Sequence, residues 1–310
     1  MKRNVIHTGD ATETLQELPA ESVNMVMTSP PYWNLRDYGV DGQLGREETA
    51  GAFVQNLADV FDEVKRVLRP DGSLWLNLGD TYDDKDLQQI PARVALELQD
   101  RGWILRNRVT WAKPNPMPQS VKDRLNDTTE AVFHFVKNRE YYYDLDAIRE
   151  PHAKSTRKRM GKGYRNASQK NKRTEGDSPG GHHRGGGVHS PGVGYDELLN
   201  EDGKNPGDVF NTSVRPFPEA HFAVYPPELC EKPIKATCPP DGVVLDPFAG
   251  AGTTLLKAKE LGRQYVGIEL NPEYADMARA RIGLSPHDPR NVRNDDDQSG
   301  LEAYADGGEP

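Results

Sequence analysis

Long hydrophobic runs are missing from this 310-residue sequence, and cysteine is nearly so. No apolar stretch approaches the roughly 20 residues that a membrane-spanning helix needs, and MKRNVIHTGD lacks the apolar segment of a signal peptide. We therefore expect a cytoplasmic protein with no membrane partner. Only Cys230 and Cys238 are present, without a CxxC pair or a histidine cluster at metal-ligand spacing. The sequence thus indicates neither a disulfide framework nor a metal site.

Net positive charge is also missing from the chain as a whole, which carries −9 at pH 7. Basic residues gather between 151 and 184, where ten lysines and arginines accompany two acidic residues, so this segment carries +8 and the remainder −17. A basic island on an acidic body is typical of a protein that touches a polyanion with one segment. A solvated charged linker would have the same composition, so composition alone leaves both interpretations open.

Apolar runs alternate with amphipathic stretches over most of the chain, which predicts an α/β fold with a mostly parallel sheet. The spacing of apolar residues predicts helices over 49–68 and 89–101, and the first should end at the stop signal RPDG. The strands expected in the first half are NVIHT, VNMVMTS, WLNLG and segments near 104–111 and 131–136.

The stretch VVLDPFAGAGTTLLKAKELG indicates a strand, a glycine-rich turn and a helix. Gly250 and Gly252 would let a ligand approach the backbone, and the helix N-terminus behind them favours an anionic group such as a carboxylate. The next expected strand ends in Glu269, which can accept hydrogen bonds from both hydroxyls of a ribose. Leu255 stands where a dinucleotide fingerprint has its third glycine. We therefore predict an adenosyl ligand that carries a carboxylate, rather than a pyrophosphate.

The stretch TSPPYW follows the second expected strand, and its two prolines force the chain to turn. On the residues alone, two interpretations are open. The stretch is an ordinary loop, or it holds Ser29, Tyr32 and the proline carbonyls around a ligand.

Together, TSPPYW, DPFAGAGTT and the GIE that ends the next strand make the chain similar to the amino-methylating DNA methyltransferases that use S-adenosylmethionine. The order, with SPPY before FAGAG, resembles that of the circularly permuted beta class. N4-cytosine modification methylases of the CTAG-recognising kind are the most similar members. The resemblance implies a Rossmann-like methyltransferase fold with a mostly parallel, seven-stranded sheet and a basic, loop-rich insertion.

The resemblance also implies two sets of site residues. The expected cofactor-binding residues are Asp10, Asp246, Phe248, Gly250, Gly252, Thr253 and Glu269. The expected catalytic residues are Ser29, Pro30, Pro31 and Tyr32. Asp10 resembles the family's acidic residue near the adenine ring, although a plain turn residue is the other interpretation.

The SPPY turn has a chemical rationale in amine methylation. An exocyclic amine is a poor nucleophile because its lone pair is delocalised into the ring. Acceptors for both amino hydrogens, here Ser29 Oγ and the Pro30 carbonyl, would free that lone pair. Tyr32 would stack on the base after its extrusion from the duplex. Serine before PPY favours cytosine N4 over adenine N6.

Other functions are less consistent with the sequence. Cytosine C5 methylation requires a nucleophilic thiolate, and Cys238 before Pro239 in TCPPDG fits a turn better. N6-adenine methylation, or a non-catalytic DNA-binding protein with a vestigial methyltransferase fold, are the alternatives that we keep. Trp33 and Trp111 are candidates for the pocket or the core, and Asp80 for the cleft or a cap.

Four segments are therefore expected along the chain: 1–150 with the SPPY motif, a basic insertion over 151–215, a cofactor-binding part over 216–284, and an acidic disordered tail over 285–310. The insertion is the candidate target-recognition region. Its residues Arg157, Lys158 and Arg159 are the expected contacts to double-stranded DNA. Nucleoid association and a cognate restriction endonuclease as a partner are further expectations.

Overall fold

The computed structural model describes residues 1–155, 200, 202–214, 225–284 and 292–293. Two compact units divide the chain, one formed by residues 1–144 and 207–310 and the other by residues 145–206. Within its described part, the smaller unit has one 3-10 turn, Asp146–Ile148, and two backbone hydrogen bonds between Glu150 and Lys204. The predicted segment boundaries stay predictions. The elements below belong to the larger unit.

The larger unit is built on one sheet, in which the described residues form nine strands. Across the sheet the order is β11 (Val292–Arg293), β1 (Val5–Thr8), β10 (Gln264–Glu269), β9 (Val243–Asp246), β2 (Val23–Thr28), β3 (Leu68–Leu78), β7 (Thr129–Val136), β6 (Ile104–Ala112) and β8 (Val209–Asn211). Neighbours are parallel except β7, which is antiparallel to β3 and β6. The predicted mostly parallel α/β sheet is confirmed, and the short edge strands β8 and β11 add to the expected seven.

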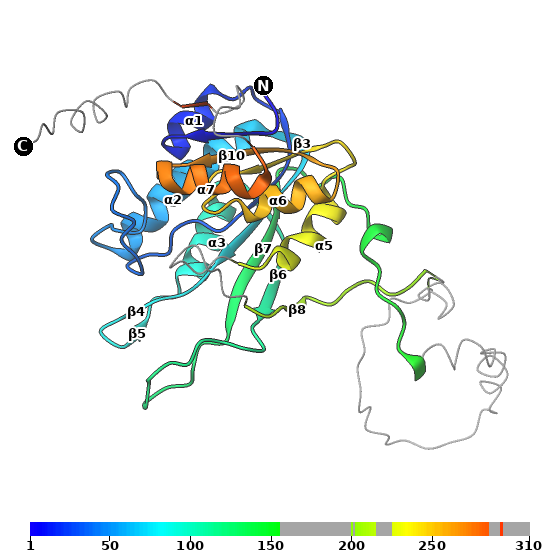
Figure 1. Ribbon diagram of the computed structural model, residues 1–310. Coiled ribbons are helices and arrows are strands. Elements are labelled where there is room, and N and C mark those ends of the chain that lie inside the picture. The colour runs from blue at the N-terminus through cyan, green and yellow to red at the C-terminus, as the bar shows by residue number, and fades with distance from the viewer. Residues whose placement is uncertain (156–199, 201, 215–224, 285–291, 294–310) are drawn as a thin grey trace, which may run out of the picture. The chain divides into compact units, whose positions relative to one another are not determined.

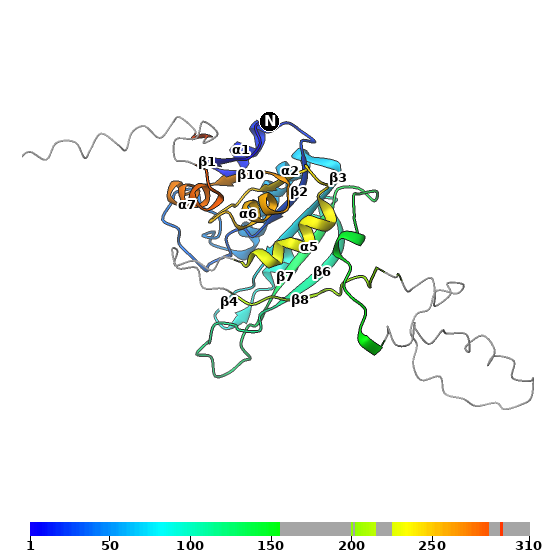
Figure 2. The same ribbon diagram turned by 45° about the vertical axis from the view of Figure 1, so that its right-hand side comes forward.

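Helices cover both faces of this sheet (Figures 1 and 2). One face packs on α1 (Ala11–Glu17), α2 (Ala50–Val67) and α3 (Ile90–Asp100), and the other on α5 (Pro227–Thr237), α6 (Thr253–Glu260) and α7 (Pro272–Ile282). Strand β2 shows the alternation, because Val26 joins the first hydrophobic cluster while Met25 and Met27 join the second. Burial on both faces explains why the central strands β2 and β9 are almost continuously apolar.

The predicted amphipathic helix over 49–68 is confirmed as α2. Thr49 caps it, because its side chain accepts a hydrogen bond from Ala52 N at 3.1 Å. Phe53, Leu57 and Phe61, four residues apart, are completely buried against the sheet.

The RPDG stretch has a different role from the one predicted. The helix does end at Val67, but β3 begins immediately and runs through RPDG, with a register shift against β2. Residues 69–71 are exposed and Gly72 is buried again. A Cβ on Gly72 would lie 2.9 Å from Asn24 O. The glycine therefore permits a close approach of two strands, in addition to any turning of the chain.

The expected strands near 104–111 and 131–136 are confirmed as β6 and β7, and the helix over 89–101 as α3. Helix α1, helix α5, strand β8 and a small hairpin, β4 (Tyr82–Asp83) with β5 (Asp86–Leu87), have no counterpart in the sequence-based prediction. Within the described residues, every helix is too short or too polar to cross a membrane.

Candidate functional site

A cavity of about 490 Å³ opens at the carboxyl ends of the parallel strands. Its lining comes from segments that follow β1, β2, β9 and β10, and from the facing ends of β6 and β7. Ligands of doubly wound sheets bind at this edge, and the volume suits a small-molecule ligand. The fold therefore brings the two predicted motifs, which lie far apart in the chain, to one site.

The glycine turn between β9 and α6 gives its two glycines different roles. Gly250, with φ of +49°, lines the cavity, and a Cβ added there would meet nothing within 4 Å. Gly252, with φ of +73°, lies outside the lining, and its added Cβ would lie 3.0 Å from Ala278 Cβ on α7. Gly250 thus leaves open space beside the backbone, whereas Gly252 allows the helices to pack.

Glu269 ends β10 and lines the cavity. Its two carboxylate oxygens accept hydrogen bonds from Gly250 N at 2.7 Å and Asn271 N at 2.9 Å. Burial raises the pKa of Glu269 to about 6, although these backbone hydrogen bonds act in the opposite direction. Each oxygen retains acceptor capacity for a further donor. The residue therefore supports the glycine turn and can also bind hydroxyl groups.

Asp246 lies beneath the turn and outside the cavity lining, with 1% of its surface exposed. Its carboxylate accepts hydrogen bonds from Thr28 Oγ1 at 2.6 Å, Phe248 N at 3.1 Å and the Tyr225 hydroxyl at 3.2 Å. Burial raises its pKa, while these donors lower it. The geometry gives Asp246 a positioning role rather than the direct ligand contact that we expected.

The other three expected cofactor-binding residues, Asp10, Phe248 and Thr253, all line the cavity. Asp10 is also the N-cap of α1, since Oδ1 accepts from Glu13 N at 3.0 Å. Asp10 therefore has a structural role as a helix cap, and its expected contact to the cofactor stays a prediction.

The four expected catalytic residues, Ser29 to Tyr32, line the same cavity and directly follow β2. The Tyr32 ring packs on Gly79, where an added Cβ would lie 2.5 Å from Tyr32 Cε2. Burial, and then the charge of Glu130, raises the pKa of Tyr32 well above its usual range, so the hydroxyl stays protonated. The turn is thus rigidly placed.

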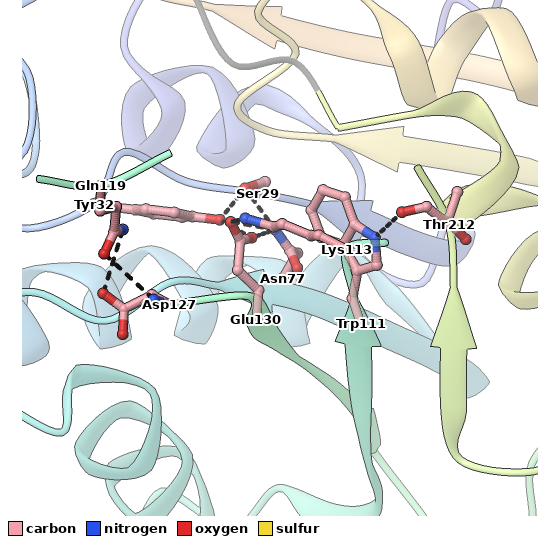
Figure 3. Close-up of polar contacts among 9 residues, drawn as sticks. All are labelled: Ser29, Tyr32, Asn77, Trp111, Lys113, Gln119, Asp127, Glu130 and Thr212. Atoms are coloured by element: carbon pink, nitrogen blue, oxygen red, sulfur yellow. Dashed lines mark hydrogen bonds and ion pairs between the residues drawn. The ribbon is translucent and has the colours of Figure 1, made fainter. Parts of the chain in front are cut away.

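A polar network joins this turn to two other strands (Figure 3). The Tyr32 hydroxyl donates to Glu130 Oε2 at 2.7 Å, and Ser29 Oγ lies 3.3 Å from the Tyr32 oxygen. Asn77 Nδ2, on β3, contacts the Tyr32 oxygen and Glu130 Oε2, both at 2.8 Å, and Ser29 Oγ at 3.3 Å. Lys113 forms an ion pair with the other carboxylate oxygen of Glu130.

Asn77, Lys113 and Glu130 were missed in the sequence analysis. Asn77 interrupts the apolar strand stretch GSLWLNLGD with a polar side chain, whereas Lys113 directly follows β6. A polar residue within a buried strand needs a partner, and that interruption was the available signal. The aromatic lining residues Tyr38, Tyr225 and Tyr274 had no such signal.

The structure also decides between the open interpretations of three residues. Trp33 is buried in the first hydrophobic cluster and donates to Glu47 O, whereas Trp111 lines the cavity and donates to Thr212 O at 2.8 Å. Asp80 caps the start of α3, because Oδ1 accepts from Ile90 N at 3.0 Å, and it is not part of the cavity lining.

The expected DNA contacts Arg157, Lys158 and Arg159 lie outside the described residues. The same is true of the acidic tail, apart from the backbone of β11. These predictions stay predictions.

Three comparisons with known proteins agree on one family. A family model described as DNA methylase matches residues 23–280. The chain is 38% identical to the Type II methyltransferase M.XycI of Xanthomonas campestris pv. cyanopsidis over 311 residues, which cover 91% of this chain and 88% of that protein.

Two solved structures are similar in fold. The PvuII DNA methyltransferase, described as cytosine-N4-specific, aligns with a TM-score of 0.64 and 22% identity over 92% of this chain and 88% of its own. A protein of Thermus thermophilus, assigned as a DNA modification methylase and complexed with S-adenosyl-L-methionine, aligns with a TM-score of 0.55 and 25% identity, covering 90% of this chain and 94% of that one.

Both cysteine thiols should be inert in the native protein. Cys230 and Cys238 are completely buried, and burial raises the pKa of Cys238 to about 12 and that of Cys230 further. Neither residue lines the cavity. With a chromogenic disulfide reagent at pH 8, we expect reaction only as fast as the protein unfolds, and rapid reaction in denaturant. Fast labelling of native Cys238 would reopen the thiolate chemistry that cytosine C5 methylation needs.

Proposed function

The chain belongs to the DNA methylase family and is a DNA methyltransferase, and we propose that it methylates the exocyclic N4 of cytosine in duplex DNA. We further propose that it has the circularly permuted arrangement of the beta class, because SPPY precedes the glycine turn along the chain. The observation that carries the proposal is the shared cavity, which Ser29 to Tyr32 line together with Gly250 and Glu269.

The methyl donor is S-adenosyl-L-methionine, as in the Thermus complex. The described residues fit this molecule. Open space beside Gly250 admits a ligand against the backbone, and Glu269 can accept from ribose hydroxyls. Asp10 and Phe248, which both line the cavity, are the proposed contacts to the adenine. When bound, the cofactor supplies an electrophilic methyl group.

The chemical task of the chain is to make the base amine nucleophilic. Ser29 Oγ and the Pro30 carbonyl are the proposed acceptors for the two amino hydrogens, and Pro31 holds the turn rigid. Hydrogen bonds to both hydrogens favour a pyramidal nitrogen, whose lone pair is then available for methyl transfer. Tyr32 would stack on the flipped base, which cannot reach the donor while inside the duplex.

Two features support cytosine as the target in this proposal. Serine, rather than an acidic or amide residue, precedes PPY at position 29. Both cysteines lie away from the cavity, so N4 rather than C5 is the accessible chemistry. N6-adenine methylation uses the same acceptor geometry and is the alternative product.

The basic insertion is the proposed target-recognition region, with Arg157, Lys158 and Arg159 as phosphate contacts. The likeness to CTAG-recognising enzymes stays a prediction, which sequencing of the methylated positions would test. A cognate endonuclease is a further proposed partner, and nucleoid DNA in the cytoplasm is the proposed place of action.

Loss of the Glu269 carboxylate should weaken cofactor binding. Because Glu269 also supports the glycine turn, the ligand is varied together with the protein. Calorimetry would compare S-adenosylhomocysteine with its 2′-deoxy analogue. A charged acceptor contributes about 1.5–3 kcal/mol, so the wild type should prefer the hydroxylated ligand by about tenfold or more, and Glu269→Ala should show almost no preference. Equal preference in both proteins would remove the assignment.

The same carboxylate should make binding depend on pH. Ribose hydroxyls donate to the ionised form, and the pKa of Glu269 in the free protein is about 6. Affinity for S-adenosylhomocysteine should therefore rise as the pH increases from 5 to 7 and then level off. Glu269→Gln, which does not titrate, serves as the control and should give a flat profile through pH 6.

Ser29→Ala should lower turnover far more than cofactor affinity, because the hydroxyl acts when the amine becomes reactive. Removal of one such hydrogen-bonding group costs about 10²–10³ in kcat. Ser22→Ala, a hydroxyl deletion outside the cavity lining, is the control. Mass spectrometry of nucleosides from the methylated DNA should find N4-methylcytosine, and N6-methyladenine alone would favour the alternative.

Replacement of Arg157, Lys158 and Arg159 by alanine should weaken DNA binding at low salt and leave cofactor binding intact. Each phosphate contact adds about 0.9 to the slope of log affinity against log salt, so the triple variant should have a flatter slope. Alanine at the exposed Lys2 and Arg3 is a charge-loss control. If the triple variant and the wild type have the same slope, the linker interpretation is correct.

A further inference from the structure

The hydrogen-bond chain behind Ser29 ends in a carboxylate, and this end fixes the direction of every donor in the chain (Figure 3). An ionised carboxylate only accepts hydrogen bonds. The Tyr32 hydroxyl must therefore donate its proton to Glu130 Oε2, 2.7 Å away. The tyrosine oxygen is left with lone pairs only, and Ser29 Oγ, 3.3 Å away, must donate to it.

The consequence for Ser29 is that its single proton is directed away from the substrate. A serine hydroxyl has one donor and two acceptor positions. With its proton directed at Tyr32, the hydroxyl retains lone pairs for an outside donor. An amine that enters the cavity can then donate to Ser29 Oγ, which is the orientation that the proposed methylation needs.

The same carboxylate fixes the orientation of the Asn77 side-chain amide. Its amide nitrogen has two protons, and its nearest acceptors, both at 2.8 Å, are the Tyr32 oxygen and Glu130 Oε2. The amide oxygen, Oδ1, is buried and has no hydrogen-bond partner among the described residues. A flipped amide would place this oxygen against the carboxylate. The carboxylate therefore decides the amide orientation even though Oδ1 loses a partner.

Lys113 pairs with the Glu130 carboxylate at the base of the β6–β7 connection. It forms an ion pair with Glu130 and lies 4.8 Å from the centroid of the Trp111 ring. The two strands are held there by a backbone hydrogen bond from Lys113 N to Thr128 O at 2.9 Å. The side chains of Lys113 and Glu130 are only 19% and 13% exposed, so the ion pair is weakly screened by solvent.

We propose that Glu130, paired with Lys113, is a positioning residue that acts through the Tyr32 hydroxyl to keep Ser29 Oγ a hydrogen-bond acceptor toward the target amine. This inference rests on the proposed function, because it assumes that Ser29 accepts from an amine. It assigns the ion pair a task in turnover and not in binding of the cofactor.

The test is Glu130→Gln, which keeps the shape but supplies a donor. The glutamine amide can donate to the Tyr32 oxygen, whose proton then turns to Ser29, and Ser29 then donates into the cavity. We expect kcat to fall about 100-fold, with the Kd for S-adenosylhomocysteine and the KM for DNA within about threefold. Glu130→Asp, which only accepts, should retain more activity than Glu130→Gln. Glu231→Gln breaks an ion pair on α5 outside the cavity lining and should leave kcat unchanged.

A second background separates positioning from simple loss of structure. Tyr32→Phe keeps the ring but removes the hydroxyl, so the proposed route from Glu130 through the tyrosine to Ser29 is lost. In that background, Glu130→Gln should lower kcat by no more than about threefold. Independent, multiplying effects of the two substitutions would overturn the proposal, as would an unchanged kcat in Glu130→Gln alone. If the wild type produces no methylated amine, the proposed function itself fails. This outcome is distinct from failure of the Glu130 proposal, which is measured as a difference in kcat between active variants.

Discussion

The buried Asp246 carboxylate is the interaction on which the rest of the site depends. It joins Thr28, at the end of β2, to Phe248 N in the glycine turn, across 218 residues of sequence. Ser29 directly follows Thr28, so one carboxylate sets the distance between the proposed base-binding turn and the proposed cofactor turn. A buried charge is stable only when donors surround it, and Asp246 has three from separate segments, Tyr225 among them. From its position behind the cavity, Asp246 therefore holds the two turns in place relative to each other.

Two carboxylates that line the cavity, Glu269 and Glu130, are held by different kinds of partner. On the cofactor side, Glu269 is held by backbone donors and is free to take further hydroxyl donors. On the proposed base side, Glu130 is held by Lys113 and by donors of the protein itself. Its carboxylate therefore sets the direction of the hydrogen bond that Tyr32 donates. Both carboxylates act by accepting. Fixed acceptors of this kind need no reorganisation when the reaction occurs.

The division of charge along the chain fits the same separation of tasks. The parts of the chain outside the basic segment are acidic, and the positive charge is concentrated between 151 and 184. Attraction to a polyanion then depends on that segment, while acidic surfaces elsewhere disfavour unspecific adhesion. The cavity lining combines six aromatic residues with a larger number of polar and charged side chains of both signs, which suits stacking and hydrogen bonding.

Sequence alone determined the fold class and the two motifs, because strand and helix periodicity and the spacing of prolines and glycines are local properties. Ser29, Tyr32, Gly250 and Glu269 were placed in one cavity as expected. Helix α1 has only seven residues, and α5 contains a proline, so neither has a clear helical pattern by itself. The partner of Tyr32 was equally hidden, since Glu130 is 98 residues away and reaches it only through the pairing of β3 with β7. Which carboxylate lines the cavity and which one lies buried behind it was decided by tertiary structure, because burial and donor geometry depend on strands that meet only in the folded sheet.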